Sequence, residues 1–465
     1  MDIETLVTKG LGNATHLVAN DAGEAVVVDP PRDAWRVEAA AAERGWRITH
    51  VLETHVHNDY LSGALELRAS VGAEILAPAR GRYAFAHRPL DDGDAVDVGG
   101  LRFVARATPG HTPEHLAWDI VPLAAVAAGP VAVANGGSLL VGSAGRTDLL
   151  GPAATDELTA AQYRTLRSLA ALPPSVHLLP THGSGSFCAA GPVARGRTTS
   201  VGEELAHNPL LVPMDSDSFR MTVLAGFGPY PTYYREMAPL NRAGPALLGS
   251  APVPPMLDPA GVRQAVAAGA VIVDARSREA FAAGHIDGSL GIELGDSFAS
   301  YVGWLVPFGA PLVLILPEPV AEARADAVAG LLRVGYDRVV GVLDGGVDVW
   351  AADGGPMSSY PVVAARTVAE EVAAGTAGRL LDVRDPNELR DDGRLDGALA
   401  IPLGELQGRL DEVRGPGPLT VLCKSGQRAS MAAGLLEAAG IDVRLVARRG
   451  ASEILAAVPA VRASA

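Results

Sequence analysis

The chain has 465 residues and a formal net charge of −15, and 48% of its residues are hydrophobic against 20% charged. This composition is typical of soluble globular protein and excludes a largely disordered chain, and the length predicts two to four domains. The acidic charge, with no basic cluster to offset it, argues against nucleic acid or a membrane surface as a partner.

The two cysteines, Cys188 and Cys423, fall in segments that we expect to belong to different domains. A disulfide framework is therefore not expected, and a reducing, cytoplasmic compartment is predicted. The N-terminus lacks the apolar core of a signal peptide. The apolar stretch 120–134 is too short to span a membrane and is interrupted by Pro and Gly, so we expect a surface insertion or hairpin there.

Short apolar runs alternate with turn residues and amphipathic stretches through about the first 185 residues. The expected strands are 25–31, 49–55, 101–108, 138–142 and 176–183, and the segment 33–45 has a helical pattern. This alternation predicts an α/β domain, several strands of which end in loops that carry histidine. The Pro-rich segment at 247–259 is predicted to be a linker that follows this domain.

Histidine is concentrated in this first part of the chain, where ten of the eleven histidines precede residue 210. His55, His57 and Asp59 occupy alternate positions after one expected strand, so their side chains project to the same side. His111 lies in the loop Pro-Gly-His-Thr-Pro, and His182 lies in Pro-Thr-His-Gly after another strand. Three such junctions predict a site for one zinc or iron ion. We expect this site to consist of His55, His57 and His111, with Asp59 and His182 beside it.

An alternative is that these histidines are hydrogen-bonded residues of a pocket that has lost its metal. The remaining histidines are expected to be surface or core residues outside the site: His16, His50, His87, His115, His177, His207 and His285.

The histidine motifs resemble the signature of the metallo-β-lactamase superfamily: His-x-His-x-Asp, then Gly-His-Thr-Pro, then a late histidine. The stretch 137–150 resembles a loop of persulfide dioxygenases and of glyoxalase-II-like thioester hydrolases. The resemblance covers about residues 1–245 and implies an αββα sandwich, which we place at residues 1–246. Within it, Arg146 and Asp148 are expected either to position substrate or to fix their loop as an ion pair.

Two residues depart from that family pattern. Tyr60 stands where the resemblance implies a histidine for a second metal ion, and Gly137 stands where it implies an aspartate ligand. A binuclear zinc site is therefore not expected. The two-histidine, one-carboxylate triad of an iron dioxygenase is reduced to His55 and His111, unless Asp59 supplies the carboxylate. We therefore expect weak oxygen consumption with glutathione persulfide, and we expect Gly137→Asp to raise iron occupancy.

Beyond the linker, an internal repeat predicts two further domains. VIVDARSREAFAAGHIDGS at 271–289 matches LLDVRDPNELRDDGRLDGA at 380–398 in register. The spacing of about 108 residues fits two complete small α/β domains with parallel sheets. We place these domains at residues 256–358 and 363–465.

The second copy carries the segment Cys-Lys-Ser-Gly-Gln-Arg between an expected strand and an expected helix. This arrangement aims backbone N–H groups at the sulfur of Cys423 and favours its thiolate. Lys424 and Arg428 are expected to add positive charge. Ser425, Gly426 and Gln427 are expected to contact substrate.

The segment resembles the rhodanese active loop, Cys-x-x-Gly-x-Arg, which implies that Cys423 accepts sulfane sulfur as a persulfide. The alternative is an inert buried cysteine. The first copy has Pro-Glu-Pro at residues 317–319 in the equivalent position, so no persulfide can form there. We therefore interpret the first copy as a scaffold or docking module.

Three functions follow from these motifs. The first is persulfide chemistry, in which a metal domain oxidises or cleaves a small thiol persulfide while Cys423 transfers sulfane sulfur, with a thiosulfate-like donor as the other expected substrate. The second is a zinc-dependent thioester hydrolase. The third is a non-catalytic metal domain joined to a sulfurtransferase. The sequence leaves a homodimer open.

Overall fold

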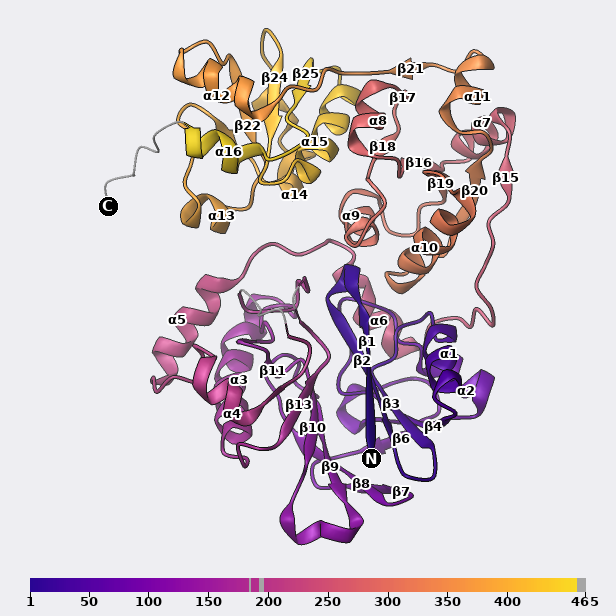
Figure 1. Cartoon of the computed structure of the whole chain (residues 1–465), viewed down its shortest axis with the longest axis vertical. Helices are drawn as coiled ribbons and strands as arrows, with labels where there is room; N and C mark the ends of the chain where they lie inside the picture. The colour runs from indigo at the N-terminus through magenta and orange to yellow at the C-terminus, as the bar shows by residue number, and fades with distance from the viewer. Residues whose placement is uncertain (184, 192–195, 458–465) are drawn as a thin grey trace. The chain divides into compact units, whose positions relative to one another are not determined.

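The computed structural model describes residues 1–183, 185–191 and 196–457 (Figure 1). The end of the predicted third domain, 458–465, lies outside the described residues. The chain divides into two compact units: Met1–Pro252 with Leu332–Gly335, and Val253–Leu331 with Tyr336–Ala465. Within the described ranges, the helices are all too short or too polar to cross a membrane.

The first unit is built on two six-stranded sheets. The first sheet contains, in spatial order, β1 (Asp2–Thr8), β2 (Asn13–Ala19), β3 (Glu24–Val28), β4 (Arg47–Leu52), β5 (Glu74–Pro78) and β6 (Arg88–Leu90). The second contains, in spatial order, β14 (Thr199–Ser200), β13 (His177–Pro180), β10 (Ala132–Gly136), β9 (Leu116–Pro122), β8 (Leu101–Ala107) and β7 (Ala95–Val98). A short hairpin of β11 (Leu139–Leu140) and β12 (Ser143–Ala144) follows β10.

Strand β8 shows why the two sheets stack. Leu101, Phe103 and Ala105 alternate along it with more exposed residues, so one face of the strand is apolar. These side chains join Trp118 of the same sheet and Val26 of the other sheet in one buried cluster between the two sheets. The core of the first unit therefore lies between two facing sheets.

Helices cover the outer face of each sheet. Helices α1 (Trp35–Glu43) and α2 (Ala64–Val71) pack on the first sheet. Helices α3 (Pro152–Ala170), α4 (Val201–His207) and α5 (Ser216–Gly226) pack on the second. The order helix, sheet, sheet, helix is the predicted αββα sandwich. The unit also contains α6 (Tyr234–Ala243) and the 3-10 helices η1 (Lys9–Leu11), η2 (Ala79–Gly81) and η3 (Leu123–Ala128).

The apolar stretch 120–134 forms a hairpin, as predicted. Strand β9 ends at Pro122, η3 follows, and β10 returns antiparallel with Ala132 opposite Ile120.

The second unit contains two parallel sheets, one for each copy of the repeat. The sheet of the first copy contains, in spatial order, β15 (Met256–Leu257), β20 (Val339–Leu343), β19 (Leu312–Ile315), β16 (Val271–Asp274) and β18 (Leu290–Gly291). Its helices are α7 (Pro259–Ala267), α8 (Arg278–Ala283), α9 (Phe298–Leu305), α10 (Val320–Arg333) and α11 (Gly346–Ala352). A small antiparallel pair, β17 (His285–Ile286) and β21 (Met357–Ser358), closes it.

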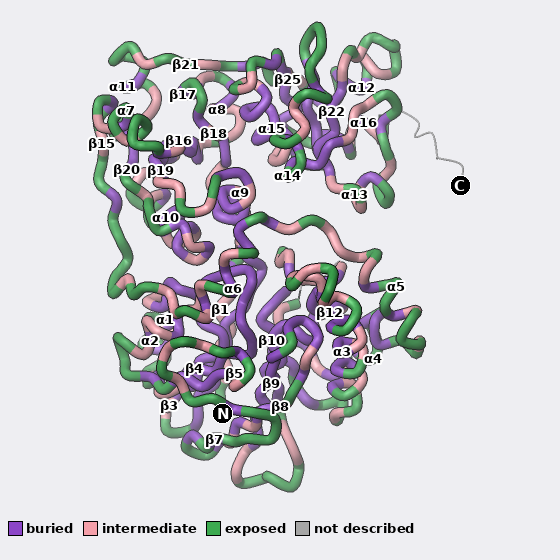
Figure 2. The backbone as a smooth tube through the Cα atoms, turned by 180° about the vertical axis from the view of Figure 1, so that it is seen from behind, coloured by how far each residue is buried: buried purple, intermediate pink, exposed green. Residues whose placement is uncertain are grey.

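The sheet of the second copy contains, in spatial order, β23 (Leu399–Ala400), β22 (Arg379–Asp382), β24 (Leu419–Leu422) and β25 (Val443–Leu445). Its helices are α12 (Ala365–Ala373), α13 (Pro386–Asp391), α14 (Leu403–Leu406), the 3-10 helix η4 (Leu410–Val413), α15 (Gln427–Ala438) and α16 (Gly450–Ala457). Figure 2 shows the central strands buried and the outer helix faces exposed.

The two copies of the repeat share equivalent side-chain hydrogen bonds. Arg276 Nη2 donates to Asp274 and to the Gly284 carbonyl oxygen at 2.8 Å. In the second copy, Arg384 Nη2 donates to Asp382 and to the Gly393 carbonyl oxygen at 2.9 Å. Each arginine thereby ties the end of a central strand to the end of the following helix, which accounts for the matched Asp-x-Arg in the two copies.

Candidate functional site

The predicted metal ligands lie in loops at one end of the first unit, where strands of both sheets finish. His55 and His57 follow β4, His111 follows β8, and His182 follows β13. All four side chains and Asp59 are buried. The structure thus brings together the five residues that the sequence singled out.

His55 is held in one tautomer by Thr54. The Thr54 hydroxyl donates its only hydrogen to Asp29 Oδ2 at 2.7 Å, so toward His55 Nδ1, 2.8 Å away, it can only accept. The His55 Nδ1 atom therefore carries the hydrogen, and Nε2 has a free lone pair. Burial lowers the pKa of His55 well below its usual range, so the ring is neutral.

His182 is fixed in the same way. Its Nδ1 lies 3.0 Å from Asn13 Oδ1 and 3.3 Å from Asp59 Oδ2, which are both acceptors. Nδ1 must then donate, and the Nε2 lone pair lies 3.3 Å from Nε2 of His55. Two lone pairs at this distance repel each other unless a cation or a proton lies between them. Although burial opposes it, His182 lowers the pKa of Asp59 to about 2.

His111 presents a third bare nitrogen. Its Nδ1 donates to the Arg146 carbonyl oxygen at 2.8 Å, since a carbonyl can only accept. Its Nε2 is buried and has no hydrogen-bond partner among the described residues. Burial lowers the pKa of His111 well below its usual range.

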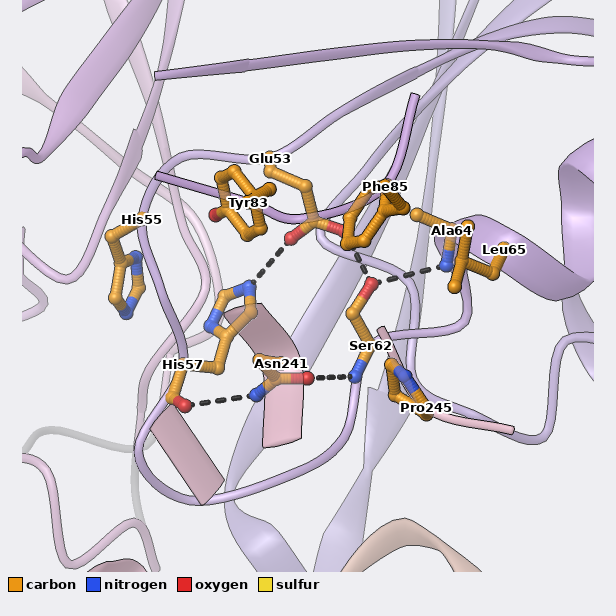
Figure 3. A pocket seen from close by; sticks show the side chains of 10 residues that line it. All are labelled: Glu53, His55, His57, Ser62, Ala64, Leu65, Tyr83, Phe85, Asn241 and Pro245. Atoms are coloured by element: carbon orange, nitrogen blue, oxygen red, sulfur yellow. Dashed lines mark hydrogen bonds and ion pairs between the residues drawn. The ribbon is translucent and has the colours of Figure 1, made fainter. Parts of the chain in front are cut away.

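His57 turns Nε2 toward carboxylates and Nδ1 toward the other histidines. Nε2 lies 3.1 Å from Glu53 Oε2 and 3.4 Å from Asp29 Oδ1. Figure 3 marks the contact with Glu53 by a dashed line. Burial lowers the pKa of His57, but Asp29 and Glu53 outweigh it and raise the pKa to about 10. Nδ1 is buried without a partner in the described part of the chain.

These histidines form two overlapping groups that could hold a metal ion. Ligand atoms of His55, His57 and His182 lie within 4.8 Å of one another, and so do those of His111, His182 and Cys188. Each imidazole is oriented by an outer hydrogen bond, which is the usual arrangement around a metal site. The grouping differs from the expected trio in one respect, because His182 rather than His111 belongs with His55 and His57 and links the two sets.

Tyr60 fills the position where the family pattern has a second-site histidine. Its ring stacks on His57 with centroids 4.3 Å apart, and its hydroxyl donates to the Asp29 carbonyl oxygen at 3.1 Å. Tyr60 therefore packs against the site, and the expectation of a single ion stays a prediction.

The expectation that Gly137→Asp would restore a carboxylate ligand does not fit the structure. A Cβ atom on Gly137 would lie 2.3 Å from His111 Cδ2. A Cβ on Gly145 would lie 2.9 Å from Cγ of the same ring. The imidazole occupies the space that a side chain at 137 needs, so an aspartate there would displace an existing ligand.

His115 is a structural residue, as expected. Its Nδ1 lies 2.8 Å from Thr108 Oγ1, and its Nε2 accepts the Gly137 N–H at 2.9 Å. Both ring nitrogens are therefore used within the protein.

Of the two roles left open for Arg146 and Asp148, the structure favours loop fixing. Arg146 donates twice to Asp148, at 2.7 and 2.8 Å, and also to the carbonyl oxygens of Phe187 and Gly228 at 2.9 Å each. Its side chain is only 3% exposed. Because its own carbonyl orients His111, this pair supports the metal site from outside.

Sequence reasoning missed the outer residues Asn13, Asp29 and Glu53 and the position of Cys188. Cys188 is buried, and burial raises the pKa of its thiol well above the usual range. Its sulfur lies within reach of His111 and His182. Only its place six residues after a candidate ligand could have indicated this.

The second predicted site is the loop between β24 and α15. The Gly426 N–H donates to Cys423 Sγ at 3.1 Å. Gly426 has φ of 96°, and a Cβ atom there would lie 1.8 Å from the Ala447 carbonyl oxygen. Only glycine fits this position.

The charged residues of this loop contact carboxylates. Lys424 Nζ lies 2.8 Å from Asp392. Arg428 binds Glu388 Oε1 at 2.7 Å and Asp385 Oδ2 at 2.9 Å, and so links the start of α15 to α13. A catalytic role for either cation stays a prediction.

An open groove lies beside Cys423. It is lined by Lys424, Ser425, Arg448, Arg449, Ser452 and Glu453. Gln427 is the first residue of α15 and is half-buried. The excess of cations suits an anionic ligand.

Comparisons with known proteins find the same three kinds of domain in the predicted order. Residues 8–191 match the family model of the metallo-beta-lactamase superfamily, and residues 258–353 and 365–452 each match that of the rhodanese-like domain. A hydroxyacylglutathione hydrolase of Cereibacter sphaeroides is 34% identical over 191 residues, which cover 39% of this chain and 67% of that protein. One of Pseudomonas putida is 39% identical over 107 residues, 23% of this chain and 41% of that protein.

Among solved structures, a metallo-beta-lactamase from Staphylococcus aureus subsp. aureus COL is similar to this chain with a TM-score of 0.65 and 25% identity. The alignment covers 74% of this chain and 98% of that one. ETHE1 from Myxococcus xanthus has 28% identity and a TM-score of 0.45, over 52% of this chain and 99% of that one.

Proposed function

Because the chain belongs to the metallo-β-lactamase superfamily and carries two rhodanese-like domains, we propose that it processes persulfides and transfers sulfane sulfur through Cys423. The observation that carries the proposal is the Gly426 N–H on the Cys423 sulfur, at the start of a helix. A sulfur atom so placed is stabilised as an anion both before and after it accepts a second sulfur.

The transfer needs no outside oxidant. The Cys423 thiolate attacks the sulfane sulfur of thiosulfate, a new S–S bond forms, and the S–S bond of the donor breaks as sulfite leaves with the electron pair. A thiolate or cyanide acceptor then attacks the outer sulfur, and the Cys423 thiolate leaves. The groove cations Lys424, Arg448 and Arg449 would hold the anionic donor.

For the N-terminal domain we propose one zinc or iron ion held by His55, His57, His111 and His182. Such an ion supplies Lewis acidity, which polarises a bound sulfur or carbonyl group. The chain's own residues keep the imidazole lone pairs of His55, His111 and His182 directed inward, through Thr54, the Arg146 carbonyl oxygen and Asn13. Although burial lowers the pKa of His57, Asp29 and Glu53 raise it to about 10, so His57 would have to lose a proton to bind the ion. The proposed substrate of this domain is the persulfide of a small thiol.

A second candidate function for the metal domain is hydrolysis of a thioester of a small thiol. The similarity of this domain to hydroxyacylglutathione hydrolases favours the thioester hydrolase. The neutral imidazoles of His55 and His111 also suit zinc, the metal that activates water for hydrolysis.

Purified full-length chain would test both proposals. Cys423→Ser should abolish sulfur transfer from thiosulfate to cyanide, whereas Cys188→Ser should leave it nearly unchanged. Full activity in Cys423→Ser would refute the sulfurtransferase assignment. Parallel assays on glutathione persulfide and on an acyl-glutathione, each with and without added zinc or ferrous iron, would separate the two candidates for the metal domain. Activity on neither substrate would leave a non-catalytic metal domain.

A further inference from the structure

One peptide group connects Cys423 to the cysteine-free copy of the repeat. The N–H that donates to Cys423 Sγ belongs to the Ser425–Gly426 peptide. The carbonyl oxygen of that same peptide, on Ser425, accepts a hydrogen bond from Arg278 Nη1 at 3.3 Å. Because a peptide group is planar, whatever holds the oxygen also sets the direction of the N–H.

Arg278 is itself held in place. It is the first residue of α8, in the cysteine-free copy, and its Nε donates to Glu293 Oε2 at 2.6 Å. Its side chain is 16% exposed. A residue of the cysteine-free domain thus orients the guanidinium that binds the loop of the Cys423 domain.

The same Arg278 nitrogen also reaches the second wall of the loop. Nη1 lies 3.4 Å from the Ala447 carbonyl oxygen, the group that abuts Gly426. One guanidinium therefore binds both the Ser425 carbonyl oxygen and the Ala447 carbonyl oxygen, which lie on either side of Gly426. A lysine could not span both carbonyls in this way.

Other residues of the cysteine-free copy also face the site. Burial raises the pKa of Tyr301 in α9 to about 12, and Arg428 and Cys423 of the other domain are among the groups near enough to shift it. Trp304 of the same helix packs on Gly404. Arg448, at the groove, forms an ion pair with Glu279. Helix α15 packs against α8, as Figure 1 shows.

We infer that the cysteine-free rhodanese-like domain is a working part of the Cys423 site, and that Arg278 is its positioning residue. Arg278 does not touch the sulfur. It fixes the Ser425–Gly426 peptide so that the N–H stays directed at Cys423. This role rests on the proposed function of Cys423, although it concerns the reactivity of the thiol itself.

The test measures the rate at which iodoacetamide alkylates Cys423 across a pH series, by peptide mass spectrometry of the full chain. Arg278→Met removes the hydrogen bonds to the two loop carbonyls and the bond to Glu293, and it keeps roughly the length of the side chain. We expect it to slow alkylation near neutral pH about tenfold and to move the pH midpoint upward, because hydrogen bonds that stabilise a charged group are lost. Arg278→Lys, which can reach one carbonyl, should fall in between.

Glu437→Gln is the matched control. Glu437 also contacts the other domain, at 3.3 Å from His285 Nε2, but it lies at the far end of α15 from the loop. We expect its alkylation profile to stay within about twofold of the parent. A parent-like profile in Arg278→Met would overturn the inference, as would an equal shift in Glu437→Gln, which would indicate domain docking alone.

If Arg278→Met does not fold, Arg278→Lys decides the question by the same profile. The alkylation assay needs no sulfur donor. A parent chain without sulfurtransferase activity would therefore refute the proposed function, while the profile would still test the role of Arg278.

Discussion

Replacing Gly137 with alanine adds one carbon atom 2.3 Å from Cδ2 and 2.9 Å from Nε2 of His111. Carbon atoms in contact lie about 3.5–4.0 Å apart, so the ring must move by roughly 1 Å or more. Gly145 packs closely against the same ring, so the movement must strain or break the 2.8 Å bond to the Arg146 carbonyl. Overpacking costs about 1–3 kcal/mol and the lost hydrogen bond about 1 kcal/mol, so we expect a fall of about 2–4 kcal/mol in the free energy of unfolding.

The measurement is urea unfolding of the first unit together with metal content per chain. Gly137→Ala and Gly137→Asp should both lower the urea midpoint and the metal content. Gly100→Ala is the matched control, because a Cβ atom there meets nothing within 4 Å. If Gly137→Asp unfolds like the parent and binds more iron, the packing argument is wrong and the family carboxylate can be restored.

Three further predictions follow from the two sites. The chain prepared without chelators should contain about one equivalent of zinc or iron. His182→Ala should remove most of this metal, whereas the control His50→Ala should not. Metal content near zero in the parent would contradict the site. Gly426→Ala should abolish thiosulfate sulfurtransferase activity without unfolding the chain, because a Cβ atom would lie 1.8 Å from the Ala447 carbonyl oxygen; full activity would contradict that geometry. Oxygen uptake with glutathione persulfide should be weak at an oxygen electrode, because the imidazole set lacks a carboxylate in the place of Gly137; rapid uptake that His111→Ala abolishes would refute this reasoning.

Local patterns in the sequence predicted most of the fold. The apolar runs at 25–31, 49–55 and 101–108 correspond to β3, β4 and β8, because alternation and burial are readable from neighbouring residues. The repeat predicted two parallel sheets, since the same Asp-x-Arg ties the same elements in each copy. The run at 138–142 is reduced to the two residues of β11 by the turn that follows.

The site was predicted only as far as motifs extend. Histidine loops indicated the candidate ligands. Which of these histidines lie together depends on contacts across the sandwich, such as that of His182 with Asn13, 169 residues away in the sequence. Charge alone suggested that Arg428 faces the sulfur. Its partner Glu388 lies 40 residues away, and no spacing rule connects the two. Polar residues that orient a ligand carry no motif of their own, so only the folded chain identifies them.

The role of Thr54 offers a direct test of the tautomer argument, because the chain contains a matched pair. Thr54→Val removes the hydroxyl that accepts a hydrogen bond from His55 Nδ1. Asp29 still accepts hydrogen bonds from the backbone N–H of residue 54, at 2.7 Å, and from the Thr181 hydroxyl. Without that acceptor, His55 is free to place its hydrogen on Nε2, so we expect metal affinity to fall about 10–100-fold.

Thr49→Val is the control for this change. The Thr49 hydroxyl lies 2.8 Å from His50 Nδ1 on the same strand, in the same i, i+1 arrangement, but His50 is outside the site. Each hydroxyl has a second contact, to Asp29 for Thr54 and to the Ala25 carbonyl oxygen for Thr49. Because the bond to buried Asp29 is the stronger, we expect Thr54→Val to lose about 1–3 kcal/mol of stability and Thr49→Val about 1 kcal/mol. Only Thr54→Val should weaken zinc binding in a chelator competition titration. Equal zinc affinity in the two variants would show that Thr54 does not set the His55 lone pair and that the ligand set must be assigned differently.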